Sequence, residues 1–315
     1  MSDKTGPAGS HVPVLLGPVL QGLNIRDNGC YVDGTFGRGG HSREILRLLG
    51  SEGRLLAIDR DAQAVAAADP GMRSDPRFEI IKDEIAHLKN IAAERGLLGK
   101  VDGLLLDLGV SSPQLDEAGR GFSFRSDGPL DMRMDPASGI SAADWLARVE
   151  EKSLKKVIAE FGEEKFAGRI ARAIIATRDS NAILRTGQLA ELVASVVPPG
   201  KKRIHPATKT FQAIRIFING ELEQLDAALA ASLDLLASGG RLCAISFHSL
   251  EDRIVKRFMR EAAAGESVPR RLPLRMHEMP QPRMRLIGKA QRASADEVAR
   301  NPRSRSATLR VAERT

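Results

Sequence analysis

Hydrophobic and polar positions follow two alternating periods in the first third of the chain. Short apolar runs typical of buried strands are separated by segments whose apolar residues recur at helical spacing. Strands are predicted at 31–32, 54–58, 77–81 and 101–106, and helices at 42–49, 62–68 and 85–95. Strands that alternate with helices of this length imply βαβ units, and therefore a mostly parallel sheet that binds ligands at the carboxyl ends of its strands.

After Asp107 the pattern changes to helical runs without an intervening strand. Helices are predicted at 142–161, 166–179, 186–197, 205–218, 221–236 and 251–263, and strands at 241–247 and 307–311. Loops are predicted at 109–114, 198–203 and 269–285, the last partly disordered until bound. The sequence therefore predicts an α/β, Rossmann-like fold with an inserted helical domain. We expect the sheet domain at 11–115 and 213–315, the insertion at 116–212, and a disordered tail at 1–10.

Residues 29–41 indicate a strand, a glycine-rich turn and the start of a helix. Four glycines in the seven residues after Asp33 permit positive φ angles and close backbone approach, which suits a nucleotide-like ligand at a helix N-terminus. The dinucleotide fingerprint G-x-G-x-x-G would need a third glycine where the chain has Ser42. An acid followed by Gly37-x-Gly39-Gly40 is instead the loose pattern of S-adenosylmethionine-dependent methyltransferases. The alternative is a turn that only reverses the chain.

A second acid, Asp59, ends a predicted strand about 20 residues after the glycine turn, where a carboxylate binds ribose hydroxyls. We therefore assign Asp59 to the ribose of the adenosine. The alternative is that Asp59 and Asp61 only cap the next helix, and for Asp61 we do predict that role.

Positive charge is concentrated near the C-terminus. The net charge is +7, but residues 253–310 contain 15 Lys or Arg and 5 Asp or Glu, an excess of +10, while the rest of the chain sums to −3. A local excess of this kind suits a polyanion such as nucleic acid, although solubility alone is the simpler explanation. An aromatic content of 4% argues against a surface that stacks many bases.

Other classes of protein are disfavoured. No apolar run approaches the about 20 residues of a membrane span, and the first ten residues lack the apolar core of a signal peptide, so we predict a cytoplasmic protein. Cys30 and Cys243 lie in predicted strands without a C-x-x-C motif. They are predicted to be reduced core residues, and no metal site is expected.

Five contiguous motifs resemble those of one family. They are Asp33-Gly-Thr-Phe-Gly-Arg-Gly-Gly-His41, Leu106-Asp-Leu-Gly-Val-Ser-Ser-Pro-Gln114, Gly121-Phe-Ser-Phe124, Asp131-Met-Arg-Met134 and Ser246-Phe-His-Ser-Leu-Glu-Asp-Arg253. From His11 to the C-terminus the chain resembles the bacterial 16S ribosomal RNA cytosine-N4 methyltransferases, also called MraW or RsmH. The resemblance implies S-adenosylmethionine as cofactor, no metal, and a cytidine in the decoding region of the small ribosomal subunit as target. It does not distinguish a monomer from a homodimer.

The resemblance also implies which residues bind the cofactor. Besides Asp33 and Asp59, they are Gly39, Gly40 and His41 in the turn, Ile85 beside the adenine, and Asp107 and Gln114 after the fourth strand. Relatives have Phe at the position of Ile85, which keeps an apolar wall but loses ring stacking. His41 could instead be only a residue at a helix start.

Methylation of an exocyclic amine needs no metal, because the sulfonium already supplies the electrophile. The enzyme must accept the N–H hydrogens and aim the lone pair. Amino methyltransferases use an Asp/Asn/Ser-Pro-Pro-aromatic loop after the fourth strand, whereas this chain has Gln114 and Leu115 at the last two positions. The predicted catalytic residues are Asp107, Ser111, Ser112 and Pro113. Asp107 could hold the cofactor or orient the target amine.

Residues that contact the substrate RNA are predicted from chemistry and position: Phe124 as a stacking ring with Phe122 and Phe247 as alternatives, His248 after a strand, Lys209, and Arg253, Arg257 and Arg260 on one helix. A Phe in such a motif is more often part of the core. Lys209 and Arg215 could bind phosphates or brace the insertion. Two rival functions remain, a DNA amino methyltransferase and a nucleic-acid-binding assembly factor with a vestigial cofactor fold.

Overall fold

The computed structural model describes residues 13–198, 205–265 and 281–315. The predicted tail at 1–10, nearly all of the loop at 198–203 and most of the loop at 269–285 lie outside the described residues. The chain divides into two compact units: unit 1 is Met1–Gly109 with Glu223–Thr315, and unit 2 is Val110–Leu222. No helix in the described part of the chain is long and apolar enough to span a membrane.

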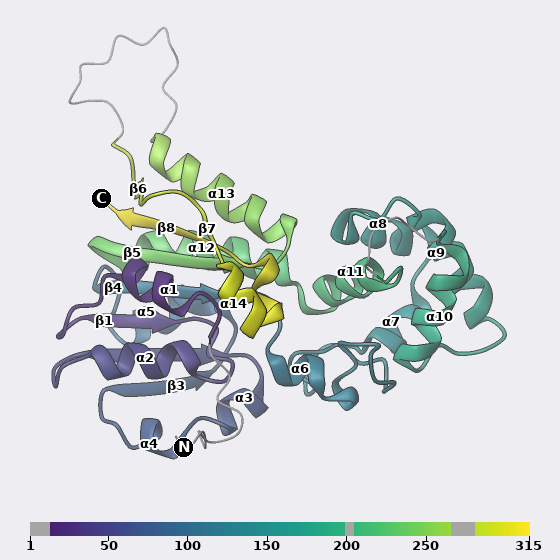
Figure 1. The fold of residues 1–315 in the computed structure, drawn as a ribbon, viewed down its shortest axis with the longest axis horizontal. Coiled ribbons are helices and arrows are strands. Elements are labelled where there is room, and N and C mark those ends of the chain that lie inside the picture. The colour runs from purple at the N-terminus through teal and green to yellow at the C-terminus, as the bar shows by residue number, and fades with distance from the viewer. Residues whose placement is uncertain (1–12, 199–204, 266–280) are drawn as a thin grey trace, which may run out of the picture. The chain divides into compact units, whose positions relative to one another are not determined.

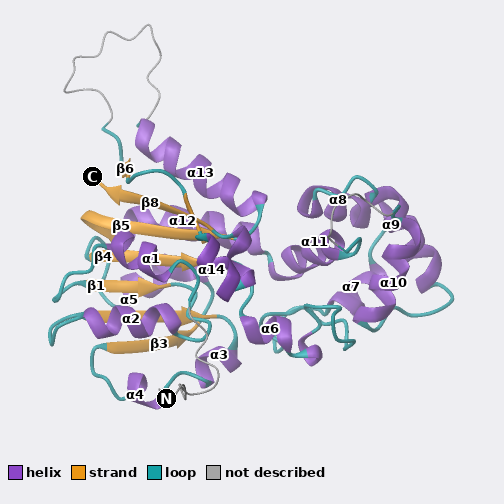
Figure 2. Cartoon of the chain, viewed as in Figure 1, coloured by secondary structure: helices purple, strands orange, loops and turns teal. Residues whose placement is uncertain are grey.

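Unit 1 is built on one twisted sheet (Figures 1 and 2). Its strands are β1 (Cys30–Asp33), β2 (Arg54–Asp59), β3 (Phe78–Lys82), β4 (Val101–Asp107), β5 (Leu236–Ser246), β6 (Met284–Leu286), β7 (Gln291–Arg292) and β8 (Thr308–Arg314). They are ordered β3-β2-β1-β4-β5-β8-β6, with β7 paired to β8. β1 to β5 are parallel, whereas β8 runs antiparallel to β5, β6 and β7. The mostly parallel Rossmann-like sheet predicted from the sequence is confirmed.

Helices cover both faces of this sheet because its central strands are apolar on both sides. Two successive residues of β1 show the alternation: Tyr31 belongs to the core that includes residues of α1 and α2, and Val32 to the core that includes residues of α5, α12 and α13. The helices involved are α1 (Leu16–Leu23), α2 (Gly40–Leu48), α3 (Ala62–Ala66), α4 (Pro70–Arg73), η1 (Ile85–His87), α5 (Leu88–Glu94), α12 (Glu221–Leu235), α13 (Ser249–Ala264), α14 (Ala295–Arg300) and η4 (Pro302–Ser306). Cys243 is buried and Cys30 only half-buried, and both are free.

Unit 2 is helical (Figure 2). Its helices are α6 (Ser112–Asp116), η2 (Ala118–Arg120), α7 (Ala142–Arg148), α8 (Glu151–Gly162), α9 (Ala167–Arg178), α10 (Thr186–Val196) and α11 (Thr208–Asn219). They enclose a core of their own that contains Trp145, the single tryptophan of the chain. The expected domain boundary after residue 212 falls inside α11, whose buried residues Phe211 and Ile214 both belong to this core.

Three local predictions differ from the structure. The single helix predicted at 142–161 is two helices, because Val149 and Glu150 take extended conformations between α7 and α8. The predicted loop after Gly109 contains the short helix α6, with Pro113 in its first turn, where the missing N–H of proline costs nothing. The strand predicted at 241–247 begins earlier, at Leu236, through an irregular pairing near Val101.

Candidate cofactor site and basic helix face

Three carboxylates lie at one edge of the sheet of unit 1. Asp33, Asp59 and Asp107 are the last residues of β1, β2 and β4, three adjacent parallel strands. The order of the strands reverses between β1 and β4, since β1 continues to β2 on one side while β4 continues to β5 on the other. Parallel α/β sheets bind their ligands outside the carboxyl ends of the strands at such a reversal.

The glycine turn after β1 is held by Asp33. One oxygen of its buried carboxylate accepts a hydrogen bond from the Thr35 N–H at 3.1 Å, and the other accepts one from the Ser42 hydroxyl at 2.6 Å. Gly39 has a φ of +68° before α2, and a Cβ there would lie 2.6 Å from the ring of Phe36. A side chain is therefore excluded at Gly39 by conformation and by packing. At Gly40 an added Cβ would lie 2.5 Å from the ring of Pro13.

Asp59 joins the second strand to the same turn. Its carboxylate accepts hydrogen bonds from the N–H groups of Gly37 at 2.7 Å and Asp61 at 2.8 Å. An ionised carboxylate has about four acceptor positions, so two hydrogen bonds leave capacity for the hydroxyls of a ribose. Asp61 accepts from the Gln63 N–H at 3.0 Å, and its predicted role as the cap of α3 is confirmed.

Asp107 differs from the other two acids because one of its oxygens is unused. Its N–H donates to the Thr35 hydroxyl at 2.6 Å, but its Oδ1 is buried and has no hydrogen-bond partner among the described residues. The Oδ2 lies 3.6 Å from Nδ1 of His41. A buried oxygen without a donor is costly, so this position fits a ligand that brings a donor or a positive charge.

His41 presents a second acceptor at this place. Its Nε2 lies 3.0 Å from the carbonyl oxygen of Val14 and must carry the hydrogen, because a carbonyl oxygen can only accept. Burial lowers the pKa of His41 to about 4, so the ring is neutral at pH 7 and Nδ1 keeps its lone pair. His41 is therefore more than a residue at the start of α2, since it faces Asp107 as an acceptor.

The electrostatics of this edge favour a cation. Burial raises the pKa of Asp33 to about 6, with a further contribution from the charge of Asp59. Burial also raises the pKa of Asp59 and raises that of Asp107 well above its usual range, the latter with help from the charges of Asp33 and Glu251. A positively charged ligand would offset all three penalties. The sulfonium and ammonium groups of S-adenosylmethionine have this charge.

A model of the MraW methylase family matches residues 8–315. The chain belongs to the MraW methylase family. It is thus an S-adenosylmethionine-dependent methyltransferase, and the charge and acceptors at the carboxyl edge of its sheet fit that cofactor.

Solved structures resemble this MraW-family chain only distantly. A protein from Clostridium thermocellum that is described as an rRNA methylase shares 12% identity, over 97% of this chain and 100% of its own, with a TM-score of 0.45. An rRNA methylase from Streptococcus thermophilus shares 11% over 98% and 99%, with a TM-score of 0.41. A SAM-dependent O-methyltransferase from Thermotoga maritima shares 10% over 95% and 64%, with a TM-score of 0.40. Because these TM-scores are low, the comparisons with solved structures assign neither a functional residue nor a substrate to this chain.

Two other expected cofactor residues have different settings in this MraW-family chain. Ile85 begins η1 and is half-buried against the core of unit 1, near Gly34. Gln114 is buried in α6 of unit 2, where its side-chain oxygen accepts from the Ser111 N–H at 3.0 Å. Gln114 therefore helps to begin α6, together with Ser111, which caps the helix, and Pro113 in its first turn.

Unit 2 uses its expected substrate residues partly for its own structure. Phe124 packs against Phe211, with ring centroids 4.8 Å apart, and against His205 at 4.6 Å. The ammonium of Lys209 donates to the carbonyl oxygen of Glu163 at the end of α8. Arg215 makes two hydrogen bonds of 2.8 and 2.7 Å to Glu221. Within unit 2 these contacts favour bracing over phosphate binding for Lys209 and Arg215.

His248 and Glu251 form the start of α13, and the sequence did not indicate Glu251. This buried carboxylate accepts from the N–H groups of Phe247 at 2.7 Å and His248 at 3.3 Å. In return, the Glu251 N–H donates to Nδ1 of His248 at 3.4 Å. The signal that was available is an acid three residues after the residue that caps the helix, the pattern of a capping box. His248 therefore orders the beginning of α13.

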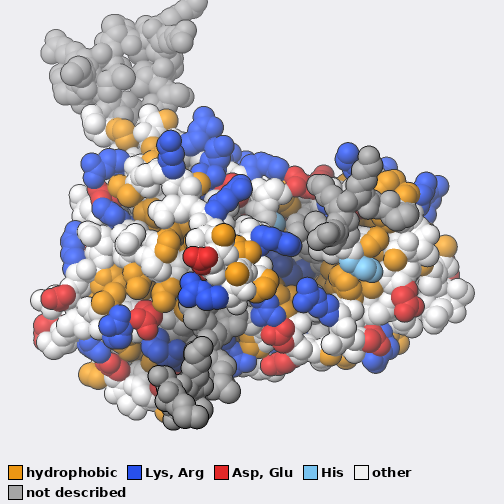
Figure 3. All heavy atoms as spheres, in the orientation of Figure 1, with side chains coloured by type: hydrophobic (Ala, Val, Ile, Leu, Met, Phe, Trp, Pro, Cys, Tyr) orange, Lys and Arg blue, Asp and Glu red, His pale blue; other side chains and the backbone are white. Residues whose placement is uncertain are grey.

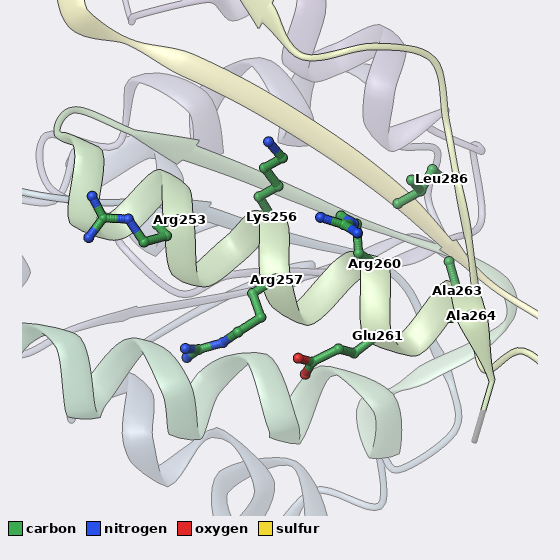
Figure 4. Close-up of a pocket in the computed structure, with 8 residues that line it drawn as sticks. All are labelled: Arg253, Lys256, Arg257, Arg260, Glu261, Ala263, Ala264 and Leu286. Carbon is green, nitrogen blue, oxygen red and sulfur yellow. The ribbon is translucent and has the colours of Figure 1, made fainter. Parts of the chain in front are cut away.

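The remaining expected residues, Arg253, Arg257 and Arg260, lie on α13 and are exposed. Figure 3 shows Lys and Arg side chains gathered where α13 runs over unit 1. The three arginines of α13, together with Lys256, line an open groove beside β6 (Figure 4).

Proposed function

We propose that the chain methylates ribosomal RNA, and that its target is the exocyclic N4 of a specific cytidine in the decoding region of 16S ribosomal RNA in the small subunit. The observation that carries the proposal is the unused acceptor of Asp107 at the end of a central strand. An exocyclic amine is a donor, and it needs such an acceptor to be oriented. The five sequence motifs that resemble the cytosine-N4 methyltransferases support the same target.

The proposed chemistry divides into positioning and proton handling. S-adenosylmethionine, when bound, supplies the methyl electrophile. Asp107 accepts an N–H hydrogen of the target amine or holds the cofactor, and neutral His41 offers a second acceptor beside it. The proton that the methylated amine must lose can pass to water, so no dedicated base is required.

The segment after Asp107 completes our assignment of the catalytic residues. Ser111, Ser112 and Pro113 occupy the sequence positions of the loop that amino methyltransferases use, and they lie at the start of α6. We assign to this segment the backbone groups that accept the amine hydrogens, and to unit 2 the recognition of the RNA. A pocket of acceptors should reject uridine, whose carbonyl oxygen would leave them without a donor. Phe124 is a less favourable stacking residue than the sequence indicates, because its ring packs in unit 2.

The test is incubation with methyl-labelled S-adenosylmethionine and naked 16S RNA, small ribosomal subunits or duplex DNA, followed by mass analysis of the nucleosides. We expect N4-methylcytidine from RNA or subunits and none from DNA. Asp107→Asn should reduce the yield. A matched control is Asp102→Asn on the same strand, because Asp102 faces Arg26 at 3.2 Å and not the cofactor edge. A methyl group on a ring carbon or on the ribose, or a preference for DNA, would contradict the proposal.

A further inference from the structure

Four basic residues form one stripe along α13. Arg253, Lys256, Arg257 and Arg260 have the spacing i, i+3, i+4 and i+7, which puts them on one side of a helix, and all four are exposed. Figure 4 shows them along the helix, from Arg253 near its start to Arg260 near Leu286 of β6. We call these four residues the basic stripe. The groove beside it is completed by Glu261, Ala263, Ala264 and Leu286.

The helix that carries the basic stripe is fixed to the sheet. Its opposite side buries Val255 and Met259, which are 1% and 2% exposed, in the main core of unit 1. Its first turn is held by the hydrogen bonds of Glu251 to the N–H groups that precede it. The backbone of the stripe is therefore ordered before any partner binds, which lowers the entropy that binding must overcome.

Three acids lie near the basic stripe: Asp252, Asp226, and Glu261, which is exposed and lines the same groove. Asp252 pairs with Arg310 through contacts of 2.8 and 3.0 Å. It also lies one helical turn before Lys256, and its pKa is lowered chiefly by Arg310 and further by the charge of Lys256. Asp226 lies 3.9 Å from Arg257, and both side chains are more than half exposed, so this pair contributes little. Neither Lys256 nor Arg260 forms an ion pair with another residue of the described chain. The positive charges of Lys256 and Arg260 are thus available to a partner.

We propose that the basic stripe binds the sugar-phosphate backbone of the substrate RNA next to the target nucleotide; this rests on the proposed function, which makes RNA the substrate. Four cations, one carboxylate and no aromatic side chain line the groove, so its net charge is positive, and it suits phosphates and cannot stack bases. The seven-residue separation from Arg253 to Arg260 spans about 10 Å along the helix.

The place of α13 supports this role. The helix starts directly after the carboxyl end of β5, at the edge of the sheet where β1, β2 and β4 end in Asp33, Asp59 and Asp107. The basic stripe thus begins beside the cofactor edge of unit 1 and leads away from it toward β6. A strand whose target base reaches that edge would have its neighbouring phosphates over the stripe, with register and orientation set by these contacts.

The decisive measurement is the salt dependence of binding to a fragment of 16S RNA, which requires no turnover. In the double variant Lys256→Gln/Arg260→Gln we expect weaker binding and a log–log salt slope smaller by about 1.4, twice the single-strand increment per phosphate. Between 50 and 200 mM salt the variant should therefore lose about sevenfold less affinity than the wild type. Its affinity for S-adenosylmethionine should not change.

A matched control removes the same charge from the opposite edge of the sheet. Arg54 and Lys100 are exposed at the amino-terminal ends of β2 and β4, so Arg54→Gln/Lys100→Gln should keep the wild-type slope. Equal salt slopes in the wild type and the stripe variant would overturn the inference. If the stripe variant kept the wild-type RNA slope but no longer bound anionic phospholipid vesicles or a protein, the stripe would serve that other partner instead. Failure of the wild type to produce N4-methylcytidine would instead refute the proposed function, while the slopes still decide the role of the stripe.

Discussion

Replacing Asp33 by asparagine should make unit 1 more stable at neutral pH. The carboxyl group is buried, and its pKa is raised from 3.8 to about 6, chiefly by burial. The folded protein therefore holds a proton that the unfolded chain releases between about pH 4 and pH 6. Above pH 6 the folded state must keep a buried charge, at a cost of about 3 kcal/mol for a difference of about two pKa units.

The asparagine side chain can keep both hydrogen bonds. Its amide oxygen can accept from the Thr35 N–H, and its NH2 group can donate to the Ser42 hydroxyl oxygen, the two groups that Asp33 contacts at 3.1 and 2.6 Å. Because only the charge is lost, the stability difference should depend on pH. Since the raised pKa favours folding at low pH, the wild type loses this contribution as the pH rises, and Asp33→Asn should gain about 1.4 kcal/mol relative to it between pH 5 and pH 8.

The assay is urea unfolding of both proteins at pH 5 and pH 8. Tyr31, the single tyrosine, lies in β1 two residues before Asp33, so its fluorescence reports unit 1, whereas Trp145 reports unit 2. Ser42→Ala is the control in the opposite direction. It removes a hydrogen bond to a charged group and should cost about 1.5 to 3 kcal/mol at pH 8, and less at pH 5.

Two results would refute this reasoning. A stability difference between Asp33→Asn and wild type that is the same at both pH values would show that Asp33 does not titrate as its burial requires. A less stable variant at pH 8 would show that the hydrogen bonds need the charge. If the charge of Asp33 serves a cation, the variant should also bind S-adenosylmethionine more weakly, and it should lose less affinity for S-adenosylhomocysteine, which lacks the sulfonium charge.

Three further changes test the site and unit 2. Asp59→Ala should weaken S-adenosylmethionine binding by about 1.5 to 3 kcal/mol, and unchanged affinity in calorimetry would remove Asp59 from the site. Arg215→Ala should destabilise unit 2 by about 3 kcal/mol in the Trp145 signal, because Glu221 is only 9% exposed and loses its guanidinium partner; a loss below 0.5 kcal/mol would contradict this. Asp107→Ala should raise the cofactor dissociation constant, whereas Pro113→Ala should lower the single-turnover rate with both ligands saturating, and full activity of the latter would exclude this loop from the chemistry.

The sheet could be predicted from sequence because its central strands are apolar on both faces and end in acids. The short strands at the edge of the sheet could not be predicted in this way. β6 and β7 are short, mostly exposed and paired to β8 through their backbones, so they leave no hydrophobic pattern. The break between α7 and α8 was also missed, since no glycine or proline marks Val149 and Glu150. There the packing of unit 2 decides the local conformation.

A candidate site residue could be predicted from the sequence where its role follows from its position at a strand end or in a turn. A strand end or a turn can be inferred from the sequence, and this placed Asp33, Asp59 and Asp107 at one edge of the sheet. Contacts between distant residues could not be inferred. No pattern in the sequence indicates that Lys209 is bound to the end of α8, or that Glu251 is a buried carboxylate that holds the start of α13.

The three acids at the sheet edge look alike in sequence, yet their hydrogen bonds assign them different tasks. Asp33 and Asp59 each accept hydrogen bonds through both carboxylate oxygens, from N–H and hydroxyl groups of the glycine turn and its neighbours. These two acids therefore shape the turn as well as supplying charge. Asp107 keeps a buried oxygen without a donor. Because an unsatisfied buried acceptor is costly, its persistence is best explained by a ligand that satisfies it. Of the three, Asp107 is therefore the residue whose removal should affect binding and chemistry most while disturbing the turn least.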